Sequence, residues 1–244
     1  MQYRWTDHDG QPIWIDCRGT IISDGDKPLY LFGCINEIGA VQKADNVSGL
    51  LGESTLKSYI QQLLPKLPNG FLLRIGLDDF KKINEKLGTD YGDRVLKRTA
   101  DDISSCILPG QKIYRVQSDE FIVLDFAGGT KSIAIDLYKR IRSFISKFVA
   151  DNHYEAVFTI SAGLLTSENI IQHTYSDIMK YSDFSLNEAK RQGKNLCYVF
   201  QQADYDKFCR RQELTKVLRQ SINEGFNGFE AYFQPLFASR TNTL

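Results

Sequence analysis

The sequence predicts an α/β protein in which helices cover one mixed β-sheet. Between about residues 54 and 200, segments with apolar residues at helical spacing alternate with short, continuously apolar runs. Their order is strand, helix, helix, strand–turn–strand, helix, strand, helix, strand, which suits a mixed sheet with helices on its faces. A hydrophobic content of 42% over 244 residues is ample for one complete domain core.

The first half of this domain contains three helical patterns and one strand. Apolar residues from 56 to 64 repeat at helical spacing, and FLLRIGL at 71–77 is typical of a buried strand. A short helix is predicted over 80–87, where a glycine follows and favours a helix end. Apolar residues between 95 and 107 predict a longer helix, which Pro109-Gly110 stops.

The second half opens with two strands joined by a turn, within KIYRVQSDEFIVLDF at 112–126. The turn is Gln117-Ser118-Asp119-Glu120, so two acids stand side by side and no glycine is present. Apolar spacing and apolar runs predict the remaining elements: a helix from about 131 to 149, a strand at 156–165, a helix from about 175 to 191 and a strand at 196–200.

Both flanks differ from this alternating pattern. Residues 3–36 contain three strand-like runs separated by the turn sequences DHDG and SDGDKP, which predicts a small antiparallel meander. Three strands alone make a marginal sheet. After residue 202, a polar helical stretch leads to GFEAYFQPLF, which has the pattern of a new strand. We therefore expect parts of two further domains beside one complete domain.

Composition argues against several classes of protein. The 30 basic and 30 acidic residues balance, so no overall charge favours nucleic acid or an anionic membrane. No apolar run approaches the roughly 20 residues of a membrane helix, and the first residues lack the features of a signal peptide. Five cysteines without CxxC spacing indicate reduced thiols and a cytoplasmic protein.

Acidic residues occur where two predicted strands end. Strand 71–77 runs into Asp78-Asp79, and the hairpin turn carries Asp119-Glu120. If these strands are neighbours, their carboxylates meet at one edge of the sheet. Magnesium prefers such oxygen ligands, and substrate phosphates complete its coordination. Lys190 and Lys194 follow the last long helix and carry charges that would neutralise phosphate.

Each of these residues also has a structural interpretation. Aspartate suits hairpin turns for local reasons, and Lys190 and Lys194 are favourable charges near the C-terminus of a helix. Asn84 and Asp93 carry side chains able to contact the edge of a base, but both are equally compatible with surface positions on helices. Taken singly, each residue favours a structural role. Only their joint order along the chain favours a functional site.

That order resembles the GGDEF family of diguanylate cyclase domains, which make cyclic di-GMP from two GTP. The resemblance covers residues 45–200 and implies the nucleotidyl-cyclase palm fold. DNVSGLLGE resembles D-x-L-T-G-L-x-N-R, and LDDFKKINEKLGTDYGDRVL resembles D-x-D-x-F-K-x-I-N-D-x-x-G-H-x-x-G-D-x-x-L. RVQSDEF falls where the family has R-x-G-G-D/E-E-F, and AKRQGKN resembles A-K-x-x-G-R-N.

The resemblance implies a nucleotide site built from four residues of this chain. Asn84 and Asp93 would hydrogen-bond guanine, while Lys190 and Lys194 would hold phosphates. Lysine stands at position 194 where the family has arginine, so a point charge replaces a bidentate guanidinium.

The departures from the family fall at its catalytic centre. By the resemblance, Asp119 would bind magnesium with Glu120 beside it, but the family's first metal-binding aspartate corresponds to Gly76. Asp78 shares a strand face with this position but lies about 7 Å further along, because each strand residue advances ~3.3 Å. Gln117-Ser118 replace the two signature glycines. We therefore expect a weakened magnesium site, with Asp78 as a poor substitute ligand, and a domain that favours binding over catalysis.

The flanks resemble parts of two other families. Residues 1–40 resemble the last strands of a PAS domain, and 203–244 combine a linker helix with the start of an EAL phosphodiesterase domain. The GGDEF-like domain between them spans 41–202. The leading hypothesis is a regulatory module that binds GTP and adjusts the adjacent EAL domain. The alternatives are an active diguanylate cyclase, or a scaffold that binds no nucleotide and forms a homodimer or relays signals.

Overall fold

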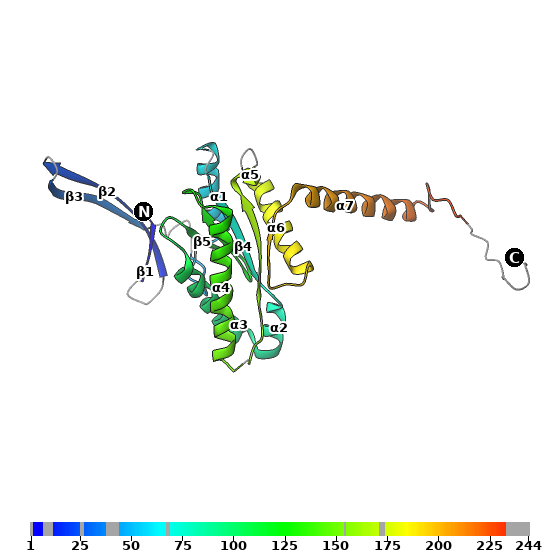
Figure 1. The fold of residues 1–244 in the computed structure, drawn as a ribbon, viewed down its shortest axis with the longest axis horizontal. Coiled ribbons are helices and arrows are strands. Elements are labelled where there is room, and N and C mark those ends of the chain that lie inside the picture. Colours follow the sequence, from blue (N-terminus) through cyan, green and yellow to red (C-terminus); the bar gives the residue numbers. More distant parts are fainter. Residues whose placement is uncertain are drawn as a thin grey trace, which may run out of the picture. The chain divides into compact units, whose positions relative to one another are not determined.

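The computed structural model describes residues 2–6, 12–24, 27–37, 44–66, 69–153, 155–170 and 174–232. The chain divides into two units, Met1–Phe200 and Gln201–Leu244, and each is considered by itself. The larger unit contains a mixed five-stranded sheet with helices on its faces, which confirms the predicted fold class (Figure 1).

The strand β4 (Phe71–Leu77) lies at the centre of this sheet, and all of its residues are buried. A strand covered on both faces needs apolar residues on both, which explains its continuous apolar sequence. β4 pairs antiparallel with β6 (Glu120–Asp125) on one side and with β7 (Ile160–Thr166) on the other. β5 (Lys112–Gln117) lies beyond β6, and β8 (Cys197–Val199) pairs parallel with β7. Strand 71–77 and the hairpin are therefore neighbours, which is the condition for their carboxylates to meet at one edge of the sheet.

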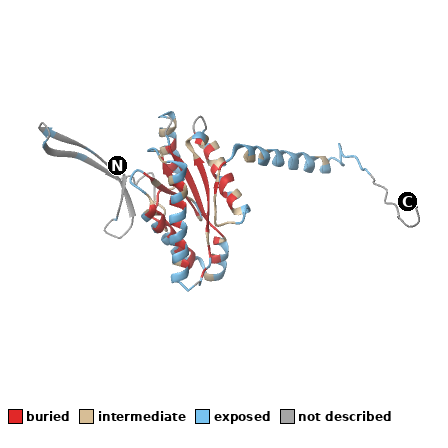
Figure 2. Ribbon diagram, viewed as in Figure 1, coloured by how far each residue is buried: buried red, intermediate tan, exposed pale blue. Residues whose placement is uncertain are grey.

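One face of the sheet carries the main hydrophobic core. Phe71, Leu73 and Ile75 of β4 belong to this core together with residues of α3 (Thr89–Cys106) and α4 (Lys131–Asp151). Figure 2 shows the buried residues gathered in the strands and along the sides of the helices that meet them. Because side chains alternate along a strand, the residues between these three point to the opposite face.

The opposite face packs closely against α6 (Tyr175–Arg191). A Cβ atom at Gly163 of β7 would lie 2.5 Å from the backbone nitrogen of Leu186 and 2.6 Å from the Cβ of Ser185. Real Cβ atoms do not approach other atoms so closely, so glycine is required for this contact. Further along α6, the last turn lies over the end of β4, where Gly76 pairs with Ser161 near the beginning of β7.

The remaining helices of this unit are short: α1 (Glu53–Leu63), the 3₁₀ helix η1 (Leu64–Lys66), α2 (Phe80–Leu87) and α5 (Ser167–Ile170). The helix α2 ends before Gly88, whose φ of 84° confirms the predicted glycine stop. The predicted start of strand 156–165 is wrong, since β7 begins at Ile160. Ile160 pairs with Leu77, and beyond Leu77 the chain turns into α2 and provides no further strand partner.

A separate antiparallel sheet precedes this domain. β1 (Gln2–Thr6), β2 (Pro12–Asp24) and β3 (Lys27–Glu37) pair in sequence order, as expected for the predicted meander. Whether this meander belongs to a PAS domain stays a prediction.

The second unit contains the long helix α7 (Gln202–Asn223), which has no buried residue. The strand predicted from GFEAYFQPLF extends into residues 233–244, which lie outside the described part of the chain. Within the described ranges, no helix combines the length and hydropathy needed to cross a membrane.

Candidate functional site

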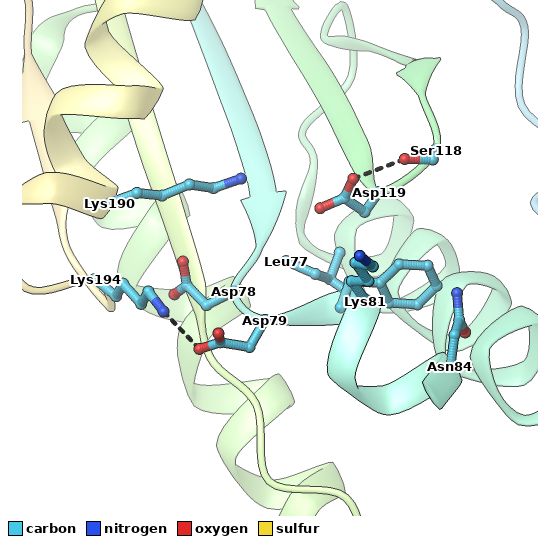
Figure 3. Close-up of a pocket in the computed structure, with 10 residues that line it drawn as sticks. Leu77, Asp78, Asp79, Lys81, Asn84, Ser118, Asp119, Lys190 and Lys194 are labelled. Atoms are coloured by element: carbon cyan, nitrogen blue, oxygen red, sulfur yellow. Dashed lines mark hydrogen bonds and ion pairs between the residues drawn. The ribbon is translucent and has the colours of Figure 1, made fainter. Parts of the chain in front are cut away.

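A pocket of about 510 Å³ opens where the chain leaves β4 and enters α2 (Figure 3). Four segments contribute to its wall: the β4–α2 turn, α2, the β5–β6 turn and the end of α6. These segments are far apart in the sequence, and the sheet and α6 bring them together. Of the predicted site residues, the pocket is lined by Asp78, Asn84, Asp119, Lys190 and Lys194.

Two predicted residues do not line this pocket. Asp93 is an exposed residue of α3. Glu120 is buried and accepts a hydrogen bond of 2.7 Å from Nε of Arg74, and a second guanidinium nitrogen of Arg74 lies 2.6 Å from the same oxygen. The Arg74 side chain is only 3% exposed, so Glu120 neutralises a charge inside the protein. Arg74 was not among the predicted residues. A single charged residue within the apolar strand FLLRIGL could have indicated a buried ion pair.

Asp78 is buried, and both of its carboxylate oxygens accept hydrogen bonds from the protein. One carboxylate oxygen accepts from Oγ1 of Thr159 at 2.6 Å and from the backbone nitrogen of Asn195 at 3.2 Å. The other oxygen accepts from Oγ of Ser161 at 2.7 Å. Through these hydrogen bonds, Asp78 connects the end of β4 to β7, to the residue that precedes β7 and to the loop after α6.

Asp79 and Lys194 form an ion pair beside the pocket. Nζ of Lys194 donates to one oxygen of Asp79 at 2.6 Å, and Lys82 lies 2.8 Å from the other oxygen. The hydrogen bonds from Lys194 and then Lys82 lower the pKa of Asp79 to about 2. Asp79 and Lys194 have φ values of 59° and 63°, a conformation uncommon for residues other than glycine. The β4–α2 turn and the loop after α6 therefore both adopt a left-handed backbone conformation at the residues that form this ion pair.

Asn84 packs against α3 through a close contact with Gly92. A Cβ atom at Gly92 would lie 1.8 Å from Oδ1 of Asn84, so a side chain there would displace Asn84 from this position. This Oδ1 atom is buried and has no hydrogen-bond partner within the described part of the chain. A buried amide oxygen without a partner is costly, and such a group in a pocket is a candidate for contact with a ligand.

Lys190 lies over Gly76. A Cβ atom at Gly76 would be 3.0 Å from Nζ of Lys190, 3.3 Å from its Cε and 3.1 Å from Cδ2 of Leu186. The ammonium group therefore stands where a side chain at position 76 would extend. Across the described residues, the Lys190 side chain has no ion pair or hydrogen bond.

The β5–β6 turn is held by Arg115. Its guanidinium donates to the backbone oxygen of Ser118 and to the carboxylate of Asp45, each at 2.5 Å. Asp45 also accepts from the backbone nitrogen and the hydroxyl of Ser48 at 2.7 Å. Residues 117–119 have no positive φ, so the turn does not require glycine. Ser118 instead donates its hydroxyl to Asp119 at 2.8 Å.

These residues do not fit a magnesium site held by several carboxylates. Position 76 carries no carboxylate, both oxygens of Asp78 accept hydrogen bonds from the protein, and Asp79 is paired with two lysines. Asp119 is the pocket carboxylate with the fewest protein partners, since among the described residues it accepts only from the hydroxyl of Ser118. Over the whole described part of the chain, no three His, Cys, Asp or Glu side chains are placed to hold a metal ion.

Comparison with known proteins gives one family. The sequence model described as "Diguanylate cyclase, GGDEF domain" matches residues 42–196. The probable diguanylate cyclase DgcT of Escherichia coli K12 is 32% identical over 168 residues, which cover 67% of this chain and 35% of DgcT. The cyclic di-GMP phosphodiesterase NbdA of Pseudomonas aeruginosa is 26% identical over 164 residues, covering 67% of this chain and 20% of NbdA.

The chain therefore spans between a fifth and about a third of the length of these two relatives. Among solved structures, the diguanylate cyclase SiaD of Pseudomonas aeruginosa, crystallised with its activator SiaC, superimposes with a TM-score of 0.58. It is 26% identical, and the match covers 64% of this chain and 60% of SiaD.

Proposed function

Because this chain belongs to the GGDEF family of diguanylate cyclase domains, we propose that it is a cyclic di-GMP signalling module that binds GTP without converting it. In this proposal, the GGDEF domain at 41–202 regulates an adjacent EAL phosphodiesterase domain. Residues 203–244 would supply the linker helix and the start of that domain, and residues 1–40 the end of a PAS domain. The match to NbdA, a cyclic di-GMP phosphodiesterase, supports this arrangement.

The residues around position 76 are the main support for the proposed lack of catalysis. Phosphoryl transfer by two metal ions needs cations that clamp both the attacking and the leaving oxygens. Here Gly76 offers no carboxylate, and the Lys190 ammonium lies 3.0 Å from the point where its Cβ would be. A pocket lies beside this position, but residue 76 carries no group able to hold a catalytic cation.

Three side chains of the pocket suit a guanine nucleotide. The unpaired Oδ1 of Asn84 would accept a hydrogen bond from the edge of guanine. Lys190 and Lys194 would contact the phosphates, and Lys194 would exchange the Asp79 carboxylate for a phosphate oxygen. Asp93, exposed on the neighbouring helix, would complete the contact with the base.

We expect calorimetric titration to show tighter binding of GTP than of ATP, and Asn84→Ala to weaken GTP binding about tenfold, the loss expected for one or two hydrogen bonds. ATP binding should change little. Asn187→Ala is the matched control, because Asn187 is exposed on α6 and bonds only Asp183 among the described residues. Equal affinity for GTP and ATP would contradict the proposed recognition, and the absence of any nucleotide binding would favour a scaffold.

An active diguanylate cyclase is the second candidate, and the partly buried Asp119 in the pocket and the identity to DgcT favour it. Incubation with GTP and magnesium, followed by chromatography of the nucleotides, separates the two. We expect GTP to remain unchanged at protein concentrations where calorimetry shows it bound. Accumulation of cyclic di-GMP would replace the proposal of a regulatory domain with that of an enzyme.

A further inference from the structure

The charges around Gly76 differ from those of a metal-binding site. Among the acids of this region, Glu120 is paired with Arg74, and Asp79 with Lys82 and Lys194. Asp78 accepts three hydrogen bonds from the protein. These three carboxylates already have partners, which leaves Asp119, bonded only by the Ser118 hydroxyl among the described residues, as a single pocket carboxylate to attract a divalent cation.

In the part of the chain that the structure describes, Lys190 places an unpaired positive charge beside position 76. Its ammonium has no anionic partner across the described residues, and it lies within 3.0 Å of the point where a Cβ of residue 76 would be. Leu186 contacts the same space from the same helix, so the ammonium is partly shielded from water. A partly desolvated cation without a partner attracts an anion more strongly than a fully solvated one.

A divalent cation would be disfavoured at the same place. Two positive charges a few ångströms apart repel each other strongly at the effective dielectric of a protein surface. Magnesium also needs oxygen ligands at fixed geometry, whereas an ammonium neutralises a phosphate without ligands of its own.

We infer that this pocket binds the triphosphate of GTP in its metal-free form, with the Lys190 ammonium in the place of a cation. The inference rests on the proposed binding of GTP and specifies the form that is bound. A module of this kind would respond to the concentration of GTP itself, and magnesium would not be needed to complete the site.

The test is calorimetric titration of the intact chain with GTP, once with excess EDTA and once with excess magnesium. The wild-type protein is expected to bind GTP more tightly in EDTA than in magnesium, because excess magnesium complexes the triphosphate and depletes its metal-free form. Equal or tighter binding in magnesium would contradict the preference for the metal-free form. Binding that requires magnesium would overturn this inference and leave the proposed GTP binding in place. No binding in either buffer would overturn both.

Two substitutions at position 76 separate charge from crowding. Gly76→Asp places a carboxylate against the Lys190 ammonium, and we expect it to weaken GTP binding in EDTA about tenfold. Gly76→Ala adds the same Cβ without charge, and the flexible end of Lys190 is able to move aside, so its affinity should stay within about threefold of wild type. Wild-type affinity of Gly76→Asp in EDTA would contradict the role of the ammonium.

A second pair of variants covers the case in which substitutions in β4 impair folding. Lys190→Met keeps the length of the side chain but removes its charge, and it is expected to weaken GTP binding in EDTA about tenfold. Arg191→Met is the matched control, since Arg191 is an exposed neighbour that pairs with Glu188 on the same helix. Equal affinities of these two variants would overturn the inference.

Discussion

Replacing Glu120 with alanine is expected to lower the free energy of unfolding by about 3 kcal/mol. The substitution leaves the Arg74 guanidinium, 3% exposed, without its close carboxylate. Loss of one partner from a buried ion pair typically costs about 3–5 kcal/mol, because the remaining charge stays desolvated. We expect the lower value, since Asp183 lies 3.4 Å from Arg74 and offers partial compensation. Urea denaturation followed by circular dichroism measures the change.

Two further variants make this result specific. Glu85→Ala removes an exposed ion pair with Lys81, whose atoms are 3.5 Å apart, and should have no measurable effect. Combining Glu120→Ala with Arg74→Met removes both charges and should restore much of the lost stability. Unchanged stability of the single Glu120→Ala variant would show that the pair is not structural and that Glu120 is available for another role.

Asp78→Ala is expected to destabilise the protein by a similar amount, about 3 kcal/mol. The carboxylate accepts hydrogen bonds from Thr159, Ser161 and the backbone of Asn195. Hydrogen bonds to charged groups contribute about 1.5–3 kcal/mol each, and some donors will find water after the substitution. The loss should be the same in EDTA and in magnesium, because the role we assign to Asp78 is structural.

Thermal denaturation in both buffers tests this assignment, with Asp101→Ala as an exposed control on α3. A variant that folds as stably as wild type in EDTA, and that loses only a stabilisation by magnesium, would instead identify Asp78 as a metal ligand. Such a result would also favour the active cyclase over the regulatory module.

Much of the fold follows from local patterns. The continuous apolar run at 71–77 predicts a strand buried on both faces, and the structure shows β4 at the centre of the sheet. The glycine stop after residue 87 predicts the end of α2. The strand at 156–165 was predicted too long, since pairing ends where β4 ends and local pattern carries no information about a partner strand.

Part of the site was also predictable. The order of motifs along the chain placed Asn84, Asp119, Lys190 and Lys194 in one region, and these four residues do line one pocket. Asp93 and Glu120 occur in the same motifs but do not line it. A motif records which residues stand near one another in the sequence, whereas burial and hydrogen bonding decide which of them face the pocket.

The sequence by itself determined the order of the elements, the missing carboxylate at position 76 and the family to which the motifs point. Only the tertiary structure decided how the charges pair. Asp79 meets Lys194 across 115 residues, and Arg74 meets Glu120 across 46. The ammonium of Lys190 lies over Gly76 because α6 packs closely on the sheet. Pairing of distant charges depends on strand order and helix packing, which are set by the burial of the whole core rather than by any local pattern.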